Sequence, residues 1–375
     1  MIASPVLVTG GAGFIGSHLV DALLARGVRV RVLDSLDPQV HGAHATRARH
    51  LPAGVELVHA SVCDGAAVDR ALAGVESVVH LAAQVGVGQS MYAIVPYVDE
   101  NVRGTAVLLD RLVNGGHRVK RLVVASSMSI YGEGRYRCPA CGPVAPPPRP
   151  LAQLEARDWE LRCPTCGAVT TPAPCDEDKP IVPTSVYAVT KRDQEELCLC
   201  VGRAYGIGTV ALRLFNVYGP RQALSNPYTG VGAIFSSRLL NGQRPLVFED
   251  GRQSRDFVHV SDIVQAFCLA LERVDVADVA LNVGTGRSTS VAALAEAIAR
   301  SMGVALAPEI VGQFREGDIR HCVADVSRIQ RRLGFSASMA LENGVVDLVS
   351  WARAQRAEDR VAQARDELDR RGLIR

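Results

Sequence analysis

Three side chains in the sequence could together remove a proton from an alcohol. Tyr187 and Lys191 are four residues apart, so both side chains fall on one face of a helix. A phenol with an ordinary pKa of about 10 is a poor base at neutral pH, but a neighbouring ammonium group or another cation nearby would lower its pKa. Ser127 belongs to a hydroxyl-rich stretch that could reach the same oxygen. The spacing also occurs in ordinary helix-surface pairs, but Lys191 is one of only three lysines among 41 basic residues.

A glycine-rich turn predicts a dinucleotide site early in the chain. Gly10, Gly13 and Gly16 follow an apolar strand-like run and open a helix-like segment. Such a turn lets the backbone approach a pyrophosphate at the helix N-terminus. Asp34 follows Gly16 by 18 residues, where a carboxylate can bond a ribose 2′-hydroxyl and would repel a 2′-phosphate. The pattern favours NAD over NADP, and the alternative is a structural turn with a helix-capping aspartate.

Four cysteines form two matching pairs in the middle of the chain. Cys138 and Cys141 make one CPxCG turn, and Cys163 and Cys166 make another 21 residues later. Two such turns can aim four thiolates at one point, as in a zinc ribbon. Four thiolates leave no open coordination position, so the predicted zinc is structural. Iron, two disulfides or free thiols are the alternatives.

The positions of these motifs predict an α/β fold. Strand-like runs at 6–8, 28–33, 55–58, 77–82, 121–125 and 209–214 alternate with helical patterns, as in a doubly wound parallel sheet of the Rossmann type. We expect an NAD-binding domain over 1–214, interrupted by a four-cysteine loop insertion at 133–183. A smaller mixed α/β substrate domain should cover 215–375, and it could be interleaved with the first. The arginine-rich tail over 352–375 is interpreted as a solvated helix.

Composition sets limits on partners and location. Hydrophobic residues make up 48% of the 375, which is enough for a sizeable core. A net charge of +2 gives no electrostatic reason to expect nucleic acid or an anionic membrane as a partner. The apolar runs are too short to span a bilayer, and the first residues lack the regions of a signal peptide. A cytoplasmic globular protein is expected.

Together the motifs resemble the extended short-chain dehydrogenase/reductase family, in its nucleotide-sugar epimerase/dehydratase branch. The resemblance is carried by the glycine turn with Asp34, the Leu81-Ala82-Ala83 run, Ser127, the Tyr187–Lys191 pair, and Arg255-Asp256-Phe257-Val258-His259. It covers nearly the whole chain apart from the insertion. These motifs are specific for the superfamily and less so for the substrate.

The resemblance implies roles for individual residues. Ser127, Tyr187 and Lys191 would be catalytic, with Tyr187 as the proton acceptor. The NAD-binding residues would be Gly10, Gly13, Phe14, Ile15, Gly16, Asp34, Ser61, Val62, Leu81, Ala82, Ala83, Asn101, Tyr187 and Lys191. Ser61 departs from the family pattern, in which many relatives have an aspartate near the adenine. The substrate would contact Ser127, Asn216, Leu246, Phe248, Arg255, Arg315 and Asp318, with the arginines suited to a diphosphate.

The residues after Ser127 favour one reaction within the family. Its 4,6-dehydratases carry an Asp-Glu pair here, its decarboxylases keep a Glu and its 3,5-epimerases have a Cys, whereas this chain has Met128 and Ser129. Without an extra carboxylate or thiol, alcohol oxidation and reduction remain. The resemblance therefore implies an NAD-dependent 4-epimerase of a nucleotide-diphosphate sugar, acting through a transient 4-keto sugar. Residues 86–92 and 221–228 are most similar to those of dTDP-L-rhamnose 4-epimerases, and a UDP-hexose is the other substrate considered.

Other functions stay open on the sequence. The nearest alternative is an NAD(P)H-dependent reductase of 4-keto-sugar nucleotides, or another nucleotide-sugar-modifying member of the same family. A non-catalytic NAD-binding regulator and a zinc-ribbon interaction module belong to different classes. The intact Ser127, Tyr187 and Lys191 argue against both. The family resemblance also implies a homodimer.

Overall fold

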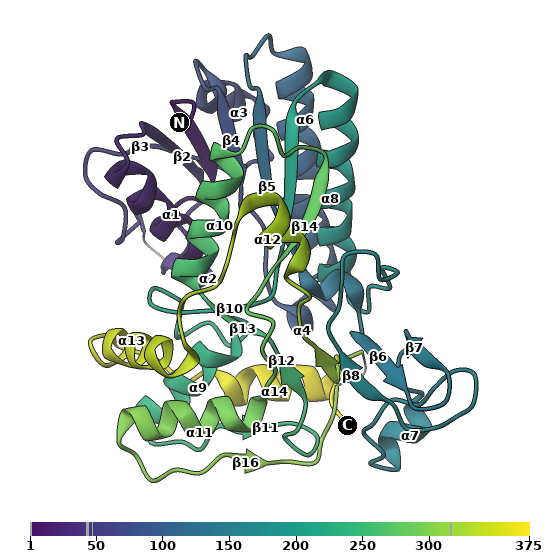
Figure 1. The fold of residues 1–375 in the computed structure, drawn as a ribbon. Helices are drawn as coiled ribbons and strands as arrows, with labels where there is room; N and C mark the ends of the chain where they lie inside the picture. Colours follow the sequence, from purple (N-terminus) through teal and green to yellow (C-terminus); the bar gives the residue numbers. More distant parts are fainter. Residues whose placement is uncertain (1, 43–44, 47, 316) are drawn as a thin grey trace.

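A seven-stranded parallel sheet forms the centre of the protein, for which a computed structural model describes residues 2–42, 45–46, 48–315 and 317–375. Its strands are β1 (Val6–Thr9), β2 (Val30–Asp34), β3 (Glu56–His59), β4 (Ser77–His80), β5 (Arg121–Ser127), β9 (Gly208–Leu214) and β14 (Val279–Val283). Their order is β14-β9-β5-β4-β1-β2-β3 (Figure 1). Six of the seven match strands expected from the sequence.

Helices cover both faces of this sheet, which confirms the doubly wound fold. On one face Val6 and Val8 of β1 join a core with α1 (Phe14–Ala25), α10 (Val260–Glu272) and α12 (Ser327–Leu333). On the other face Leu7 joins a core with α3 (Gly65–Leu72), α6 (Gly104–Asn114) and α8 (Val186–Tyr205). Successive strand residues point to opposite faces, so a strand buried on both sides is apolar throughout.

The seventh strand comes from a part of the chain that was expected to lie in the substrate domain. β14 pairs with β9 in parallel, Leu281 opposite Leu212, and α10 packs against α1. The chain therefore leaves the sheet after residue 214 and later returns to it. The two segments are interleaved, and the domain limits at 214 and 215 stay a prediction.

A smaller group of elements lies below the carboxyl ends of the sheet strands (Figure 1). Three of its helices share a third core: α9 (Val231–Leu240), α11 (Val291–Met302) and α13 (Leu341–Arg353). The last helix is α14 (Val361–Arg370). Short strands complete the group: β10 (Asn216–Tyr218) with β13 (Phe257–His259), β11 (Leu246–Val247) with β16 (Glu309–Ile310), and β12 (Ser254–Arg255) between β15 (Thr289–Ser290) and β17 (His321–Cys322). This is the expected mixed α/β part.

The cysteine-rich insertion folds as a small unit at the side of the molecule (Figure 1). Its antiparallel sheet has the order β7-β6-β8, formed by β6 (Arg135–Cys138), β7 (Gly142–Val144) and β8 (Thr171–Ala173). A single short helix, α7 (Leu151–Glu155), lies between β7 and β8.

The helix expected over 96–113 is present, but it is not a regular α-helix throughout. It consists of α5 (Ile94–Tyr97), a π-helical segment η1 (Val98–Arg103) and then α6. Other short elements are α2 (Pro38–His41), α4 (Val87–Ser90) and the 3₁₀ turn η2 (Met128–Tyr131). A π-helical segment inside a helix often marks a functional site.

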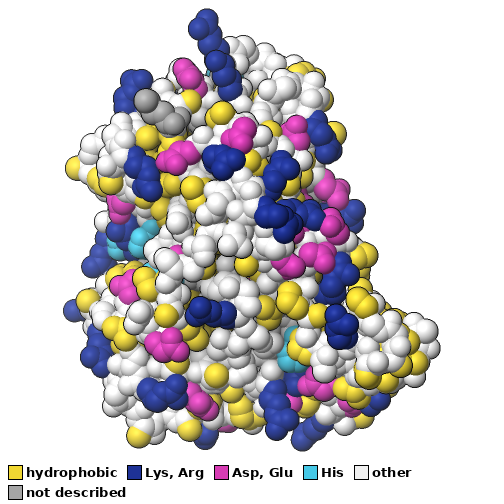
Figure 2. Space-filling model, in the orientation of Figure 1, with side chains coloured by type: hydrophobic (Ala, Val, Ile, Leu, Met, Phe, Trp, Pro, Cys, Tyr) yellow, Lys and Arg dark blue, Asp and Glu magenta, His cyan; other side chains and the backbone are white. Residues whose placement is uncertain are grey.

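The surface carries charges of both signs. On the face shown in Figure 2, Lys and Arg side chains alternate with Asp and Glu. Among the described residues, no helix combines the length and the apolar character needed to cross a membrane.

Candidate active site

A cavity of about 630 Å³ lies where the sheet strands end and the smaller group of elements begins. In an open parallel sheet this is where ligands bind. It brings together nearly all of the predicted site residues: Gly10, Gly13, Phe14, Ile15, Gly16, Asp34, Val62, Leu81, Ala82, Ala83, Ser127, Tyr187, Lys191, Asn216, Leu246, Phe248, Arg255, Arg315 and Asp318.

Two predicted cofactor residues do not line this cavity. The Ser61 hydroxyl donates to the Glu100 carboxylate (3.0 Å) and accepts from the Cys63 N–H. Asn101 is fully buried in the π-helical segment, where its amide bonds both Gln84 backbone groups and the Thr190 hydroxyl (2.9 Å). Asn101 therefore holds the loop after β4 against α8, and its polar atoms are used within the protein.

The glycine turn has the close packing that a dinucleotide site requires. Gly10 has φ +68°, and a Cβ there would lie 2.7 Å from the Ala82 N. A Cβ on Gly16 would collide with the Gly10 carbonyl oxygen. A Cβ on Gly13 would lie 3.3 Å from the Gly10 carbonyl oxygen, which is also a tight contact, and Gly13 lines the cavity at the start of α1.

Asp34 completes the expected cradle. Its carboxylate accepts from the Ala12 N–H and the Leu36 N–H, both at 2.9 Å, and lies at the cavity wall at the end of β2. The amide donors fix the carboxylate where the glycine turn meets the second strand. The turn, the helix start and the acid therefore fit an adenine dinucleotide with a free ribose hydroxyl.

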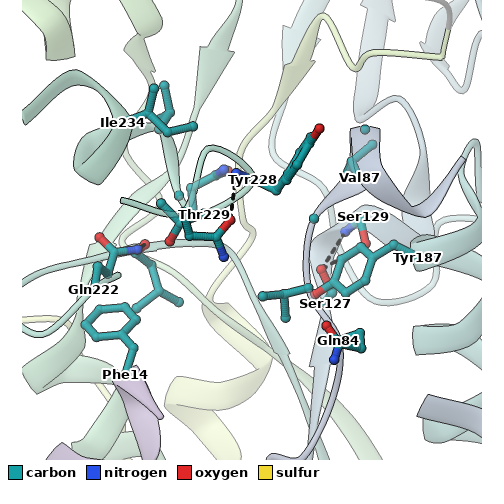
Figure 3. Close-up of a pocket in the computed structure, with 18 of the residues that line it drawn as sticks. Phe14, Gln84, Val87, Ser127, Ser129, Tyr187, Gln222, Tyr228, Thr229 and Ile234 are labelled. Atoms are coloured by element: carbon teal, nitrogen blue, oxygen red, sulfur yellow. Dashed lines mark hydrogen bonds between the residues drawn. The ribbon is translucent and has the colours of Figure 1, made fainter. Parts of the chain in front are cut away.

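Tyr187 and Ser127 meet across the cavity wall. Figure 3 shows the phenol beside Ser127 and Ser129, with Phe14, Gln222 and Ile234 on the other side. The Ser127 oxygen accepts from the Ser129 hydroxyl (2.9 Å) and from the Ser129 N–H. Its own proton is therefore free to be donated to Tyr187, with which Ser127 is hydrogen-bonded. β5 supplies the serine and α8 the tyrosine.

The protein's own groups do not make this phenol acidic. Burial raises the pKa of Tyr187 to about 12, and the hydrogen bond with Ser127 offsets this only in part. The Lys191 ammonium makes its hydrogen bonds elsewhere. Its Nζ donates to the Ala125 carbonyl (3.0 Å) and to the Gln194 side chain (2.8 Å).

Lys191 ends a buried polar chain behind the cavity. Gln194 donates to the Thr105 hydroxyl (2.9 Å), and His80 bonds both that hydroxyl and Thr9. Burial lowers the pKa of Lys191 to about 7 and that of His80 to about 3. His80 is therefore a neutral link at pH 7, and Lys191 exchanges a proton in the neutral range.

The opposite end of the cavity is built for a flat, anionic ligand. The Arg315 guanidinium lies 4.4 Å from the centre of the Phe248 ring. Among the described residues, neither the buried Nε of Arg315 nor the buried Oδ1 of Asn216 has a hydrogen-bond partner. Arg255 is held by the carbonyl oxygens of Ile319 and Arg320. An aromatic ring, an amide and two arginines in one wall suit a base and a diphosphate.

One wall was not expected from the sequence. Val361, Ala364, Arg365 and Leu368 of α14 line the cavity, so the arginine-rich tail is not simply solvated. The signal was the apolar spacing i, i+3, i+7 of Val361, Ala364 and Leu368, which predicts one buried helix face. The many arginines of the outer face obscured it.

The four cysteines of the two CPxCG turns come together at the tip of the insertion. All four sulfur atoms lie within 4.8 Å of one another, and the Cys138 and Cys166 sulfurs are 3.5 Å apart. In a tetrahedral zinc site with Zn–S of about 2.3 Å, the sulfurs would be about 3.8 Å apart. All ten cysteines are free thiols, so the two-disulfide alternative is not the arrangement here.

Fold and site define a dinucleotide-binding enzyme of the short-chain dehydrogenase type. The chain belongs to the NAD-dependent epimerase/dehydratase family, whose model matches residues 6–150 and 163–284. The match is interrupted within the insertion. The predicted family is thereby confirmed.

Individual relatives agree with this assignment. The chain is 39% identical to a dTDP-L-rhamnose 4-epimerase of Burkholderia thailandensis, over 92% of this chain and 94% of that protein. The structure of a Thermus thermophilus UDP-glucose 4-epimerase in complex with NAD matches with a TM-score of 0.74 and 31% identity, covering 94% of this chain and 99% of that one. A Thermotoga maritima UDP-glucose 4-epimerase with UDP-glucose matches with the same TM-score and 30% identity, over 93% and 98%.

Proposed function

We propose that this protein is an NAD-dependent 4-epimerase of a nucleotide-diphosphate sugar. The observation that carries the proposal is the pairing of Tyr187 with Ser127, next to Lys191, in the wall of the cavity. The two residues that follow Ser127 in the sequence are Met128 and Ser129. Tyr187, Ser127 and Lys191 can together remove and return an alcohol proton, and the chain has no carboxylate or thiol at those two positions for water elimination or carbon-acid chemistry.

The glycine turn and Asp34 would hold the cofactor. When bound, NAD supplies the acceptor and then the donor of one hydride, so that it ends each turnover unchanged. Its cationic ring would also lower the pKa of Tyr187, which the protein alone leaves at about 12.

The protein's own residues would remove the proton of the sugar 4-hydroxyl group and later return it. Ser127 holds the sugar 4-hydroxyl oxygen while Tyr187 takes its proton and the C4 hydrogen departs as hydride. The 4-keto sugar then presents its other face. Hydride returns to C4, and Tyr187 gives the proton back to the oxygen. One C–H bond is broken and one is formed, so the configuration at C4 is inverted with no net oxidation.

A dTDP-6-deoxyhexose such as dTDP-L-rhamnose is the proposed substrate, with a UDP-hexose as the second choice. A dTDP-L-rhamnose 4-epimerase is 39% identical to this chain and aligns over nearly its whole length. The apolar side chains of Val87, Ala364 and Leu368 on the cavity wall would suit a sugar that lacks a 6-hydroxyl. Phe248 and Arg315 would hold the base and the diphosphate.

We also propose a structural zinc at Cys138, Cys141, Cys163 and Cys166. The insertion has one small three-stranded sheet and one short helix, too little apolar content to fold by itself. A bound metal would tie its two CPxCG turns together.

A homodimer is proposed from the apolar surface of neighbouring helices. α5, the π-helical segment and α8 are in contact with one another. They expose Ile94, Val95, Val98 and Val189, with Val95 at 70%. A second copy would bury this surface.

The deciding experiment is to incubate the purified protein with dTDP-L-rhamnose, UDP-glucose and GDP-mannose, without added reductant, and follow C4 by NMR. We expect inversion at C4 of one of them. Tyr187→Phe should lower the rate by about 10²–10⁴-fold. Tyr205→Phe, at the exposed end of the same helix, is the matched control and should retain full activity. A strict requirement for added NADH or NADPH would favour the reductase instead.

A further inference from the structure

The four-cysteine insertion contributes no side chain to the cavity wall, although it lies between Ser127 and Tyr187 in the sequence. None of residues 133–183, all of which the structure describes, lines the cavity. The insertion instead sends charged side chains behind the cavity wall. Two of these, Arg149 and Glu133, are only 2% and 5% exposed.

Arg149 connects the insertion to two wall segments at once. Its Nη2 donates to the Glu249 carboxylate (2.8 Å) and to the Asp318 carbonyl oxygen (3.0 Å). Its Nη1 donates to the Trp159 carbonyl oxygen within the insertion (3.1 Å). A single planar guanidinium therefore fixes residues 149, 249 and 318 relative to one another.

Arg320 makes the second connection and is fully buried. It contacts Glu160 of the insertion (2.6 Å), Glu249 (2.9 Å) and Asp250 (2.6 Å). Its backbone N–H donates to Glu133, at the start of the insertion (2.9 Å). The insertion thus contributes Glu133, Arg149 and Glu160 to a network of charged side chains. The other members of this network, Glu249, Asp250 and Arg320, belong to the wall segments. Removing Arg149 would take away one of the two guanidinium partners of Glu249 and break the ion pair with Glu133, which weakens the compensation of these buried charges.

The segments held in this way carry the side chains proposed to contact the nucleotide. Glu249 directly follows Phe248 and has φ +53°, a conformation that a residue other than glycine adopts at a cost. Arg315, three residues before Asp318, stacks on the Phe248 ring. Phe248 and Arg315 can form one flat surface only if the segments around 249 and 318 keep their spacing, and Arg149 spans that spacing.

We propose that the insertion positions the nucleotide-binding wall, with Arg149 as the positioning residue. Arg149 touches neither the cavity nor the catalytic groups, so its effect should fall on nucleotide binding. The inference rests on the proposed function in assigning Phe248 and Arg315 to the nucleotide. Its chemical basis, an ion network between the insertion and this wall, does not depend on the sugar.

The test compares Arg149→Gln with Arg162→Gln. Arg162 also belongs to the insertion and forms an ion pair with Asp158 (2.7 Å), but this pair is half exposed and outside the network. We expect Arg149→Gln to raise KM for the nucleotide sugar, and Kd for dTDP and UDP measured by calorimetry, by at least about tenfold. The kcat should change less than about threefold, and NAD affinity should not change. Arg162→Gln should match the wild type.

The conservative variant guards against misfolding. Arg149→Lys keeps the positive charge but not the guanidinium that bonds Glu249 and Asp318 at the same time. It should give a smaller rise in KM for the nucleotide sugar and in Kd for dTDP and UDP. If Arg149→Gln does not fold, this variant decides. A folded Arg149 variant with unchanged nucleotide Kd, or with kcat reduced as much as KM is raised, overturns the inference. If the wild type converts no sugar nucleotide, the proposed function fails, while the Kd ratios for dTDP and UDP still judge the role of Arg149.

Discussion

At the scale of single residues, the site keeps its proton acceptor neutral. Burial and the hydrogen bond with Ser127 leave the pKa of Tyr187 at about 12, so the phenol is protonated throughout the neutral range. Lys191, with a pKa lowered to about 7, is directed to the Ala125 carbonyl and Gln194. The protein alone is therefore a poor base. A positive charge next to the phenol is needed to make it one.

This leads to a prediction about pH. Tyr187 is protonated below its pKa, so phenolate absorbance from this residue should stay absent below about pH 10 in the protein free of cofactor. NAD⁺ should move its titration at least about one pH unit lower, since one unit corresponds to about 1.4 kcal/mol of charge interaction. The measurement is the ultraviolet difference between wild type and Tyr187→Phe during a pH titration. NADH, whose ring is uncharged, is the control, and an equal shift with both forms would contradict the argument.

At the scale of elements, two irregular segments hold regular helices and strands in place. The π-helical segment places Asn101 between the loop after β4 and the helix of Tyr187, through Gln84 and Thr190. The insertion gathers four cysteines at one end, and at the other end Arg149 and Glu160 lie behind the cavity wall that carries Phe248 and Arg315. In each case the irregular segment fixes the position of a more regular one.

Loss of the proposed zinc should therefore destabilise the four-cysteine insertion first. We expect the purified protein to contain about one zinc per chain, and Cys141→Ser to lose most of it. Melting temperature should fall by roughly 5 °C or more, because the insertion would lose its main cross-link. Metal analysis and calorimetry measure both effects. Cys200→Ser, an exposed cysteine on α8, is the matched control, and zinc-free wild-type protein of unchanged stability would contradict the prediction.

At the scale of the whole molecule, the cavity depends on parts of the chain that are far apart. Gly13, Ser127, Tyr187, Phe248 and Leu368 all line it. The residues after α14 also contact the segment next to Arg315, because Phe314 and Arg375 form two backbone hydrogen bonds with each other. The cavity is therefore formed by segments from both ends of the chain, α14 included.

Removal of residues 361–375 should open the sugar end of the cavity. We expect KM for the nucleotide sugar to rise by about tenfold or more, equivalent to about 1.4 kcal/mol of lost apolar contact. NAD affinity should be retained, because Arg365 and Arg375 bond Gln313 and Phe314, next to Arg315, rather than the glycine turn or Asp34. Steady-state kinetics and NAD titration separate the two. Arg370→Ala, on the exposed face of α14, is the control and should behave as the wild type.

The proposed dimer gives a further prediction. Val95→Glu would place a charge in the apolar surface on α5 and should shift the protein from dimer to monomer, as measured by light scattering after size exclusion. The matched control is Val274→Glu, an equally exposed valine at 70% on a different surface. A monomeric wild type would refute the proposal.

Local sequence patterns were enough to predict the family, the fold and most of the residues that line the cavity. Glycine spacing, an acid after the second strand and a Tyr–Lys pair on one helix face are local patterns, because adjacent backbone geometry imposes them. Nearly all residues identified in this way line one cavity. Ser61 and Asn101 were placed by resemblance, and their side chains turn to Glu100, Gln84 and Thr190 instead.

Features that depend on contacts between distant segments emerge only in the folded protein. Folding returns β14 to the first sheet, puts α14 over the cavity and joins Arg149 to Glu249 behind it. The pKa values of Tyr187 and Lys191 likewise follow from burial, which the spacing of the two residues does not reveal. Local sequence encodes which elements form and which face they bury, whereas burial and ion pairing are fixed only when those faces meet.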